Sequence, residues 1–352
     1  VSKEHYVKDE DIFYIIFTSG STGKPKGVSI TYANLNHFLD WYTAYYDGKG
    51  PQVFLGHPPF SFDLSVMSLW PALYMHIPLI QIDKQHLQDF KVLFKTLEES
   101  KATVWISTPS FAEMCLADPS FNEDLLPELE QFVFCGEKLM ERFPKAEVVN
   151  TYGPTESTVM VTWMPLTKEL VERYPDNLPV GVVKPGTTVL IDGENSGEII
   201  IYGNTVAKGY YENPEMNQKH FFEVDGERAY RTGDVGHFEG ELLFCEGRID
   251  FQIKLHGHRI ELEDIDNNLL KNPKIRQAAT VPSFADGKVK SITSFVVYNE
   301  PIEKRFETVK LVKKELAQHV PEYMIPKKVV FLDEMPLNNN GKIDKKQLKE
   351  LV

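Results

Sequence analysis

The chain has 352 residues and a formal net charge of −13, with 42% apolar and 25% charged residues. The length suits about two or three domains, and the fractions are typical of a globular protein. The acidic balance disfavours nonspecific nucleic-acid binding. No apolar run approaches the roughly 18 residues of a membrane-spanning helix, and the polar Val1–His5 is not followed by the apolar segment of a secretory leader, so we expect no membrane insertion.

The cysteines and the charge distribution give two further expectations. Cys115, Cys135 and Cys245 form no C-x-x-C pair, which argues against a disulfide framework or a structural zinc site and is typical of a cytoplasmic protein. Residues 251–352 carry 18 Lys/Arg and 14 Asp/Glu, whereas residues 1–250 carry 20 and 37. The basic C-terminal part either docks an acidic partner or is a solvated, lysine-rich surface.

The first distinctive stretch is Thr18–Gly27, which follows an apolar run, Ile12–Phe17, that predicts a buried strand. The stretch combines glycines, lysines and hydroxyl side chains. Such a loop can bring backbone N–H groups, hydroxyls and positive charge to an anion, which indicates a phosphate-binding loop. It is not a Walker A loop, because Pro25 follows the Gly-Lys pair. A flexible surface loop is the structural alternative.

Residues 28–165 then predict alternating helices and strands. Val28–Tyr46 has helical spacing of its apolar residues. The later strands are expected at 52–56, 78–82, 102–106, 132–136 and 147–150, and the later helices at 66–75, 87–99 and 109–116. This alternation predicts a mainly parallel sheet with helices on both faces. In such sheets ligands bind beyond the carboxyl ends of the strands, so the loops 18–27, 135–137 and 151–156 are expected to converge on one site.

Asp63 is the single carboxylate in a stretch rich in aromatic and aliphatic residues, Phe60–Ser65. A buried carboxylate needs a partner, because an unpaired buried charge is very costly. Two interpretations are equally open from the residues alone. Asp63 either contacts a ligand or caps the helix that starts near Val66, a role that Ser65 could also serve.

From about Leu178 the pattern changes to short β-type runs separated by Gly, Asn and Pro. We therefore expect a large domain of residues 1–249, with a β-rich subdomain at about 178–249, and a small domain of residues 250–352. The small domain mixes helices and strands. It ends in a polar, turn-rich loop at 336–344, followed by a last helix.

Seven stretches resemble, in the same order, the motifs of the adenylate-forming (AMP-binding) enzyme superfamily. They are TSGSTGKPKG at 18–27, FDLS at 62–65, NTYGPTE at 150–156, GEIIIYGNTVAKGYY at 197–211, YRTGDV at 230–235, GRIDFQIKLHGHRIELEDI at 247–265 and PLNNNGKID at 336–344. The resemblance implies an α/β fold with a large domain and a mobile α+β C-terminal domain. Members usually have a further N-terminal portion of roughly 150 residues, so we expect this chain to be the C-terminal part of a longer enzyme.

Within the superfamily the chain most resembles the ligases that load D-alanine onto a carrier protein for the D-alanylation of teichoic acids. The stretches His57–Met67, Val133–Glu137 and Asn150–Thr162 carry this closer resemblance. The implied reaction forms an acyl adenylate and pyrophosphate from ATP, and then transfers the acyl group to the phosphopantetheine thiol of an acidic carrier protein. The alternatives are an adenylation domain for another amino acid, an acyl-CoA ligase, or a non-catalytic fragment.

The resemblance also implies roles for individual residues. Lys342 corresponds to the catalytic lysine and Glu156 to the Mg²⁺-binding carboxylate, although a solvated surface lysine is the alternative for Lys342. Asp250 corresponds to the hinge between the two domains. The implied ATP-binding residues are Thr18, Ser19, Gly20, Ser21, Thr22, Lys26, Asn150, Thr151, Tyr152, Gly153, Thr155, Asp234, Arg248 and Lys342.

For the substrate, Asp63 corresponds to the acid that pairs with the α-ammonium of an amino acid, a group that acyl-CoA ligases do not need to bind. Asp234 and Arg248 could instead form a structural ion pair, and Cys135 and Met160 could simply pack in the core. Cys135, with Met160, Val133 and Thr151, would narrow the substrate pocket. With Asp63, the implied substrate-binding residues are Val133, Cys135, Thr151, Val159 and Met160.

Overall fold

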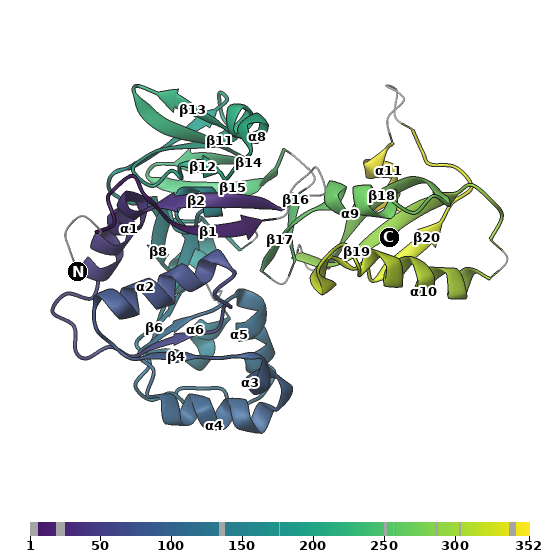
Figure 1. Ribbon diagram of the computed structural model, residues 1–352. Helices are drawn as coiled ribbons and strands as arrows, with labels where there is room; N and C mark the ends of the chain where they lie inside the picture. The colour runs from purple at the N-terminus through teal and green to yellow at the C-terminus, as the bar shows by residue number, and fades with distance from the viewer. Residues whose placement is uncertain are drawn as a thin grey trace. The chain divides into compact units, whose positions relative to one another are not determined.

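The computed structural model describes residues 6–18, 25–133, 138–175, 177–249, 252–255, 257–285, 288–302, 304–337 and 343–352. The chain divides into two compact units, which are described separately (Figure 1). The first unit contains residues 1–17 and 27–249, and the second contains residues 18–26 and 250–352.

Within the described part of the first unit, the largest sheet has seven strands. In spatial order these are β4 (Leu79–Gln81), β3 (Phe54–Gly56), β5 (Val104–Ile106), β6 (Gln131–Val133), β7 (Glu147–Tyr152), β8 (Thr162–Pro165) and β9 (Val182–Val183). The strands from β4 to β7 pair in parallel, whereas β8 and β9 add antiparallel pairs. The carboxyl ends of the parallel strands therefore meet at one edge of the sheet.

Both faces of this sheet are covered by helices. Successive residues of each strand point to opposite faces and therefore pack in two different apolar clusters. Phe54, Val104 and Val133 pack in one apolar cluster with residues of α1 (Tyr32–Ala44) and α2 (Val66–Tyr74). Their neighbours Leu55 and Trp105 pack in a second cluster with the helices of the other face. These are α4 (Phe90–Ser100), α5 (Pro109–Leu116) and α6 (Leu139–Arg142), drawn in Figure 1.

A second sheet in the first unit is antiparallel. It comprises β10 (Thr187–Asp192), β11 (Gly197–Gly203), β14 (Glu227–Glu239) and β13 (Phe221–Val224), with β15 (Leu242–Arg248) also paired to β14. A smaller sheet has the order β1 (Ile12–Thr18), β2 (Lys26–Thr31) and β12 (Gly209–Tyr210). The short helices α3 (Lys84–Gln88), α7 (Lys168–Arg173) and α8 (Pro214–His220) complete the described α-helices of this unit.

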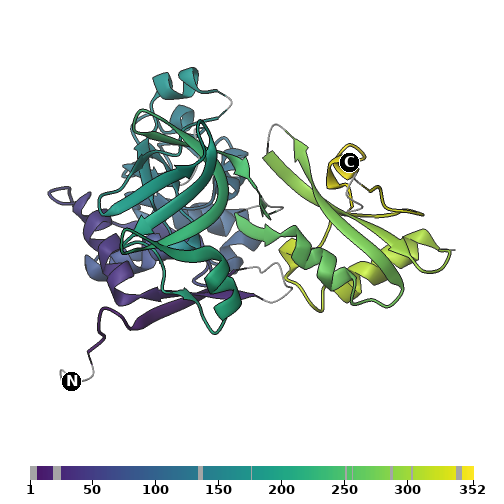
Figure 2. The same ribbon diagram turned by 90° about the horizontal axis from the view of Figure 1, so that it is seen from above.

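In the second unit, the paired strands β16 and β17 are followed by a three-stranded sheet packed by helices (Figures 1 and 2). Strands β18 and β19 pair antiparallel, and β20 pairs parallel with β19. One face packs on α9 and α10, and Leu348 of α11 packs on the other. The elements are β16 (Gln252–Leu255), β17 (His258–Glu261), α9 (Leu262–Leu269), β18 (Ile275–Ala285), β19 (Lys288–Tyr298), α10 (Arg305–Leu316), β20 (Lys328–Phe331) and α11 (Lys345–Lys349).

The structure confirms the expected α/β class, with a mainly parallel sheet covered by helices on both faces. The strand expected at Ile12–Phe17 is present as β1, but it is not buried as predicted, since Phe17 is 63% exposed. Two further predicted elements are wrong. Residues 28–31 are not helical but belong to β2, which pairs with β12, and the helix begins only after Thr31, whose side chain caps it. The single helix expected at 87–99 is divided into α3 and α4, because the carboxylate of Asp89 caps a new helix start.

No helix in the described part of the chain is long and apolar enough to cross a membrane.

Lys184, next to β9, is a charged residue in the core of the first unit. Its side chain is 2% exposed, and its ammonium has no hydrogen-bond partner among the residues that the structure describes. The ammonium lies 5.5 Å from the ring centroid of Trp41 and 5.7 Å from that of Phe38. These cation–π contacts offset part of the desolvation cost. Burial nevertheless lowers the pKa of Lys184 to about 7.

Replacing Lys184 with methionine is expected to stabilise the protein at pH 7 and to change the pH dependence of its stability. The unfolded lysine has a pKa of 10.5 and the folded one a pKa of about 7. Between these values the unfolded state binds more protons, so the free energy of unfolding should rise with pH, by roughly 1 kcal/mol per unit. Urea denaturation of wild type and Lys184→Met at pH 7, 8 and 9 measures this difference, and parallel stability curves would contradict it.

Candidate active site

Asp63 and Thr155 come from separate loops at the carboxyl edge of the parallel strands and contact each other. Asp63 begins a short 3₁₀ turn, Asp63–Ser65, and Thr155 begins another, Thr155–Ser157, after β7. The hydroxyl of Thr155 donates to Oδ2 of Asp63 over 2.5 Å. Ser65, at the N-cap of α2, makes no side-chain capping bond. Asp63 is thus partnered by a hydroxyl from the turn after β7, and its contact with a ligand stays a prediction.

Tyr14 of β1 lies near this carboxylate. Burial raises the pKa of Tyr14 far above its usual value, and the negative charge of Asp63 raises it further. Tyr14 therefore remains a neutral phenol beside Asp63, and the charge of this part of the site comes from the carboxylate.

The turn that follows β7, residues 153–159, is packed too tightly to hold a side chain at its first position. A Cβ at Gly153 would lie 2.5 Å from the carbonyl oxygen of Val159 and 2.9 Å from Cα of Met160. Thr158 and Val159 have φ values of 53° and 61°. Such angles are outliers for β-branched residues, and strained backbone of this kind concentrates at functional sites. Below, "the β7 turn" means residues 153–159.

The β7 turn is also held by a segment between β11 and β12. The backbone N–H of Ala207 donates to the carbonyl of Glu156 over 2.9 Å. Thr205 makes two further bonds, because its hydroxyl donates to the carbonyl of Ser157 and its own carbonyl accepts from the hydroxyl of Thr158, each over 2.7 Å. Glu156, Ser157 and Thr158 are thus held by contacts outside the turn.

Glu156 is fully buried. The hydroxyl of Tyr210, on β12, donates to Oε1 of Glu156 over 2.7 Å. The described residues include no cluster of three or more His, Cys, Asp or Glu side chains suited to a metal ion. A single carboxylate still fits magnesium where a nucleotide supplies phosphate oxygens, because Mg²⁺ is commonly held by one or two carboxylates, substrate phosphates and water.

Tyr152, Asp234 and Arg248 form a connected polar group. The hydroxyl of Tyr152 donates to Oδ2 of Asp234 over 2.6 Å, and the guanidinium of Arg248 lies 2.6 Å from Oδ1. Burial, with the adjacent Asp234 carboxylate, raises the pKa of Tyr152 well above its usual value. The ion pair predicted as an alternative for Asp234 and Arg248 is present. It leaves room for a ligand role, since a carboxylate has about four acceptor positions.

The implied substrate residues that the structure describes are all buried in the first unit, apart from the partly exposed Asp63. Val133 at the end of β6, Val159 and Met160 are buried in one apolar cluster that also includes Leu64, the residue after Asp63. Thr151 on β7 is buried as well. This placement is compatible both with core packing and with an apolar wall beside the carboxylate.

Three further predicted site residues make other contacts or end a strand, and the remaining ones lie outside the described residues. Lys26 is buried at the start of β2, and its ammonium lies 3.4 Å from a carboxylate oxygen of Glu261, which also belongs to the second unit. Asn150 donates to the carbonyl of Pro179. Thr18 ends β1. The predicted residues outside the described ones are Ser19, Gly20, Ser21, Thr22, Cys135, Asp250 and Lys342.

The two flanks of the stretch that contains Lys342 are held together. Leu337 and Ile343 form an antiparallel bridge, and the backbone N–H of Asp344 donates to the carbonyl of Pro336 over 2.8 Å. The ammonium of Lys345 also forms a 2.8 Å ion pair with Asp266 of α9. The residues on either side of Lys342 are thus tied to each other and to the second unit.

Tyr210, Thr205 and Ala207 were given no role by the sequence, although they lie in the quoted stretch 197–211. Their contacts to the β7 turn come from residues about 50 positions away in the chain. Sequence periodicity carries no information on such contacts.

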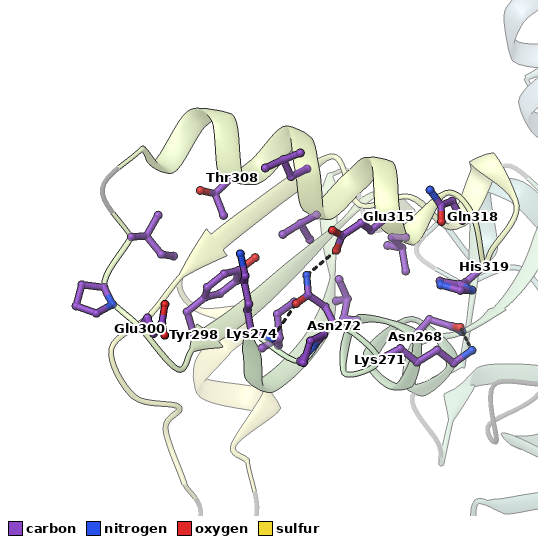
Figure 3. Close-up of a pocket in the computed structure, with 18 residues that line it drawn as sticks. Asn268, Lys271, Asn272, Lys274, Tyr298, Glu300, Thr308, Glu315, Gln318 and His319 are labelled. Atoms are coloured by element: carbon purple, nitrogen blue, oxygen red, sulfur yellow. Dashed lines mark hydrogen bonds between the residues drawn. The ribbon is translucent and has the colours of Figure 1, made fainter.

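The second unit contains a cavity of about 480 Å³ that no predicted site residue lines (Figure 3). It lies between α10 and the segment that follows α9, where the side-chain amide of Asn272 donates to Glu315 over 2.5 Å. Its size alone does not assign it a function, and the candidate active site remains the group of residues around the β7 turn.

Comparisons with known proteins identify the class of protein. The sequence matches the AMP-binding enzyme family over residues 2–211 and the AMP-binding enzyme C-terminal domain over residues 264–342. The chain belongs to the AMP-binding enzyme family, and the resemblance drawn from its motifs is confirmed.

Among curated relatives, the "D-alanine--D-alanyl carrier protein ligase" of Bacillus velezensis is 45% identical over 100% of this chain and 73% of its own length. The ligase of the same name from Bacillus licheniformis is 47% identical, with coverages of 99% and 72%.

Among solved structures, the Vibrio cholerae adenylation domain AlmE in complex with glycyl-adenosine-5'-phosphate has a TM-score of 0.83 at 24% identity, and the match covers 99% of this chain and 68% of that one. At this identity the likeness shows the fold alone. The holo form of PA1221, an NRPS protein containing adenylation and PCP domains, has a TM-score of 0.77 at 27% identity, with coverages of 97% and 60%.

Substituting Gly153 with alanine is expected to destabilise the first unit by about 1–3 kcal/mol, the usual cost of forcing an extra methyl group into a packed region. ATP binding should weaken as well, because the β7 turn would have to shift. Thermal unfolding and ATP titration measure the two effects. Gly50→Ala is the matched control, since a Cβ there meets no atom within 4 Å. Equal behaviour of the two variants would contradict the packing argument.

Proposed function

We propose that this chain acts in the cytoplasm, where it activates D-alanine with ATP as D-alanyl adenylate and transfers it to the phosphopantetheine thiol of a D-alanyl carrier protein. The loaded carrier would supply D-alanine for the D-alanylation of teichoic acids. The observation that carries the proposal is the contact of Asp63 with Thr155. It joins a carboxylate suited to an α-ammonium to the β7 turn, which lies in the nucleotide-binding motif. The identity of 45–47% to ligases of that name over nearly the whole chain supports the same substrate.

In the first step a carboxylate oxygen of the amino acid attacks the α-phosphorus of ATP, and the bond to the pyrophosphate oxygen breaks. Both reactants are anions, so positioning and electrostatic stabilisation must supply most of the catalysis. Asp63 would hold the α-ammonium, and Lys342 would bridge the substrate carboxylate and the α-phosphate. Mg²⁺ held by Glu156 would neutralise phosphate charge when bound.

The group of Tyr152, Asp234 and Arg248 would bind the adenosine. The hydrogen bond from Tyr152 to Asp234 fixes both side chains before a nucleotide arrives, and the remaining acceptor positions of Asp234 suit the two ribose hydroxyls. Preorganised donors and acceptors lose little freedom on binding, which favours affinity. Thr18, Ser19, Thr22 and Lys26 would contact the pyrophosphate side.

In the second step the phosphopantetheine thiol attacks the acyl carbon, and AMP leaves. The family carries out its two steps with different orientations of the small domain, for which Asp250 would serve as the hinge. The excess of basic residues in 251–352, 18 against 14 acidic, suits an acidic carrier protein.

Substrate-dependent pyrophosphate exchange tests the substrate class. We expect D-alanine to support faster exchange than L-alanine, other amino acids or short fatty acids. The alternatives of another amino-acid adenylation domain or an acyl-CoA ligase predict a different best substrate, and such a result would contradict the proposal. Lys342→Ala addresses the alternative of a non-catalytic fragment, because unchanged adenylate formation in this variant would remove the catalytic assignment.

Asp63→Asn is expected to raise the KM for D-alanine by roughly 100-fold or more, because losing one partner of a buried ion pair costs about 3–5 kcal/mol. The KM for ATP should change little, since the role assigned to Asp63 concerns the amino acid. Steady-state pyrophosphate exchange measures both constants. Asp47→Asn, at an exposed carboxylate of the same unit, is the control. Equal losses of affinity for ATP and D-alanine would instead indicate a structural role.

A further inference from the structure

The contact between Tyr210 and Glu156 joins two fully enclosed side chains from distant parts of the sequence. Glu156 is 0% exposed and Tyr210 is 2% exposed, and the phenol donates to Oε1 over 2.7 Å. A hydrogen bond to a carboxylate in such surroundings is strong and directional. It therefore restricts how the plane of the Glu156 carboxylate can rotate.

Tyr210 is itself held firmly. Its ring packs against Phe221 at a centroid distance of 5.3 Å. Its backbone N–H and carbonyl both bond to the side-chain amide of Asn217, over 2.6 Å and 2.9 Å. A second phenol, that of Tyr230, lies 3.4 Å from the Tyr210 hydroxyl. The donor that Glu156 uses therefore has a fixed position.

The strand that carries Tyr210 also pairs with the chain that leaves the predicted phosphate loop. Tyr210 lies opposite Val28 of β2, and Gly209 lies opposite Ser29. The N–H of the next residue, Tyr211, donates to the carbonyl of Gly27 over 2.7 Å. One short strand thus connects the exit of the loop at 18–27 to the Glu156 carboxylate.

We propose that Tyr210 is a positioning residue for the Glu156 carboxylate, which it orients toward a divalent cation bound with the nucleotide. The inference rests on the proposed function, in which Glu156 holds the metal. Tyr210 touches neither metal nor substrate in this role. It acts through the hydrogen bond, as residues behind metal ligands commonly do.

The test measures Mn²⁺ binding in the presence of ATP and the absence of amino acid. The electron paramagnetic resonance signal of free Mn²⁺ reports how much of the ion remains unbound. Wild type is compared with Tyr210→Phe, Glu156→Gln and the control Tyr42→Phe. The control also removes a buried phenol, but from a different cluster. Loss of a partner behind a metal ligand typically weakens metal binding roughly 10- to 100-fold, and we expect this range for Tyr210→Phe, a loss at least as large for Glu156→Gln, and none for Tyr42→Phe.

A second readout separates positioning from general damage. In pyrophosphate exchange, Tyr210→Phe should need more Mg²⁺ for half-maximal rate, with kcat at saturating Mg²⁺ close to that of wild type. If Glu156→Gln weakens Mn²⁺ binding and Tyr210→Phe does not, the inference is wrong while the proposed function stands. If Glu156→Gln itself leaves Mn²⁺ binding unchanged, the metal assignment in the proposed function fails as well. Failure of Tyr210→Phe to fold would make Tyr210 a residue of the core and would also overturn the inference.

Discussion

The candidate active site depends on the close packing of Gly153 against the carbonyl of Val159. This contact folds the β7 turn back on itself and brings Thr158 and Val159 into the left-handed region. A strained backbone persists only where the surroundings over-determine it, and here Thr205 and Ala207 supply the bonds that hold it. The turn can then present Thr155 to the carboxylate of Asp63 and Glu156 to the phenol of Tyr210.

A common feature of the site is that its buried and partly buried carboxylates each have a specific donor. Asp63 accepts from Thr155, Glu156 from Tyr210, and Asp234 from Tyr152 and Arg248. Charge that is already oriented in a water-poor site interacts strongly with a ligand and requires little reorganisation. Lys184 is the contrasting case, because it is enclosed by aromatic rings and burial lowers its pKa. The three carboxylates thus have hydrogen-bond donors, whereas burial lowers the pKa of Lys184 and favours its neutral form.

Much of the architecture was predictable, because strands buried on both faces and helices with one apolar face leave clear periodic patterns. The helix at Pro109–Leu116 and the strand at Val104–Ile106 are examples. The errors occurred where a local signal was ambiguous. Among residues 28–31 only Val28 and Ile30 are apolar, a stretch too short to separate a helix from a strand, and pairing with β12 decided between them. At Asp89 the capping carboxylate outweighed the continuous helical pattern on either side.

The sequence by itself determined the family and the alternation of strands and helices, and it predicted a role for each motif, because these depend on residue types and spacings along the chain. It left two interpretations open for Asp63 and assigned no role to Tyr210. Only the tertiary structure decided that Asp63 contacts Thr155, about 90 residues away, and that Tyr210 contacts Glu156. Such contacts depend on which strands become neighbours, a property of the packed sheets that no local pattern of residues encodes.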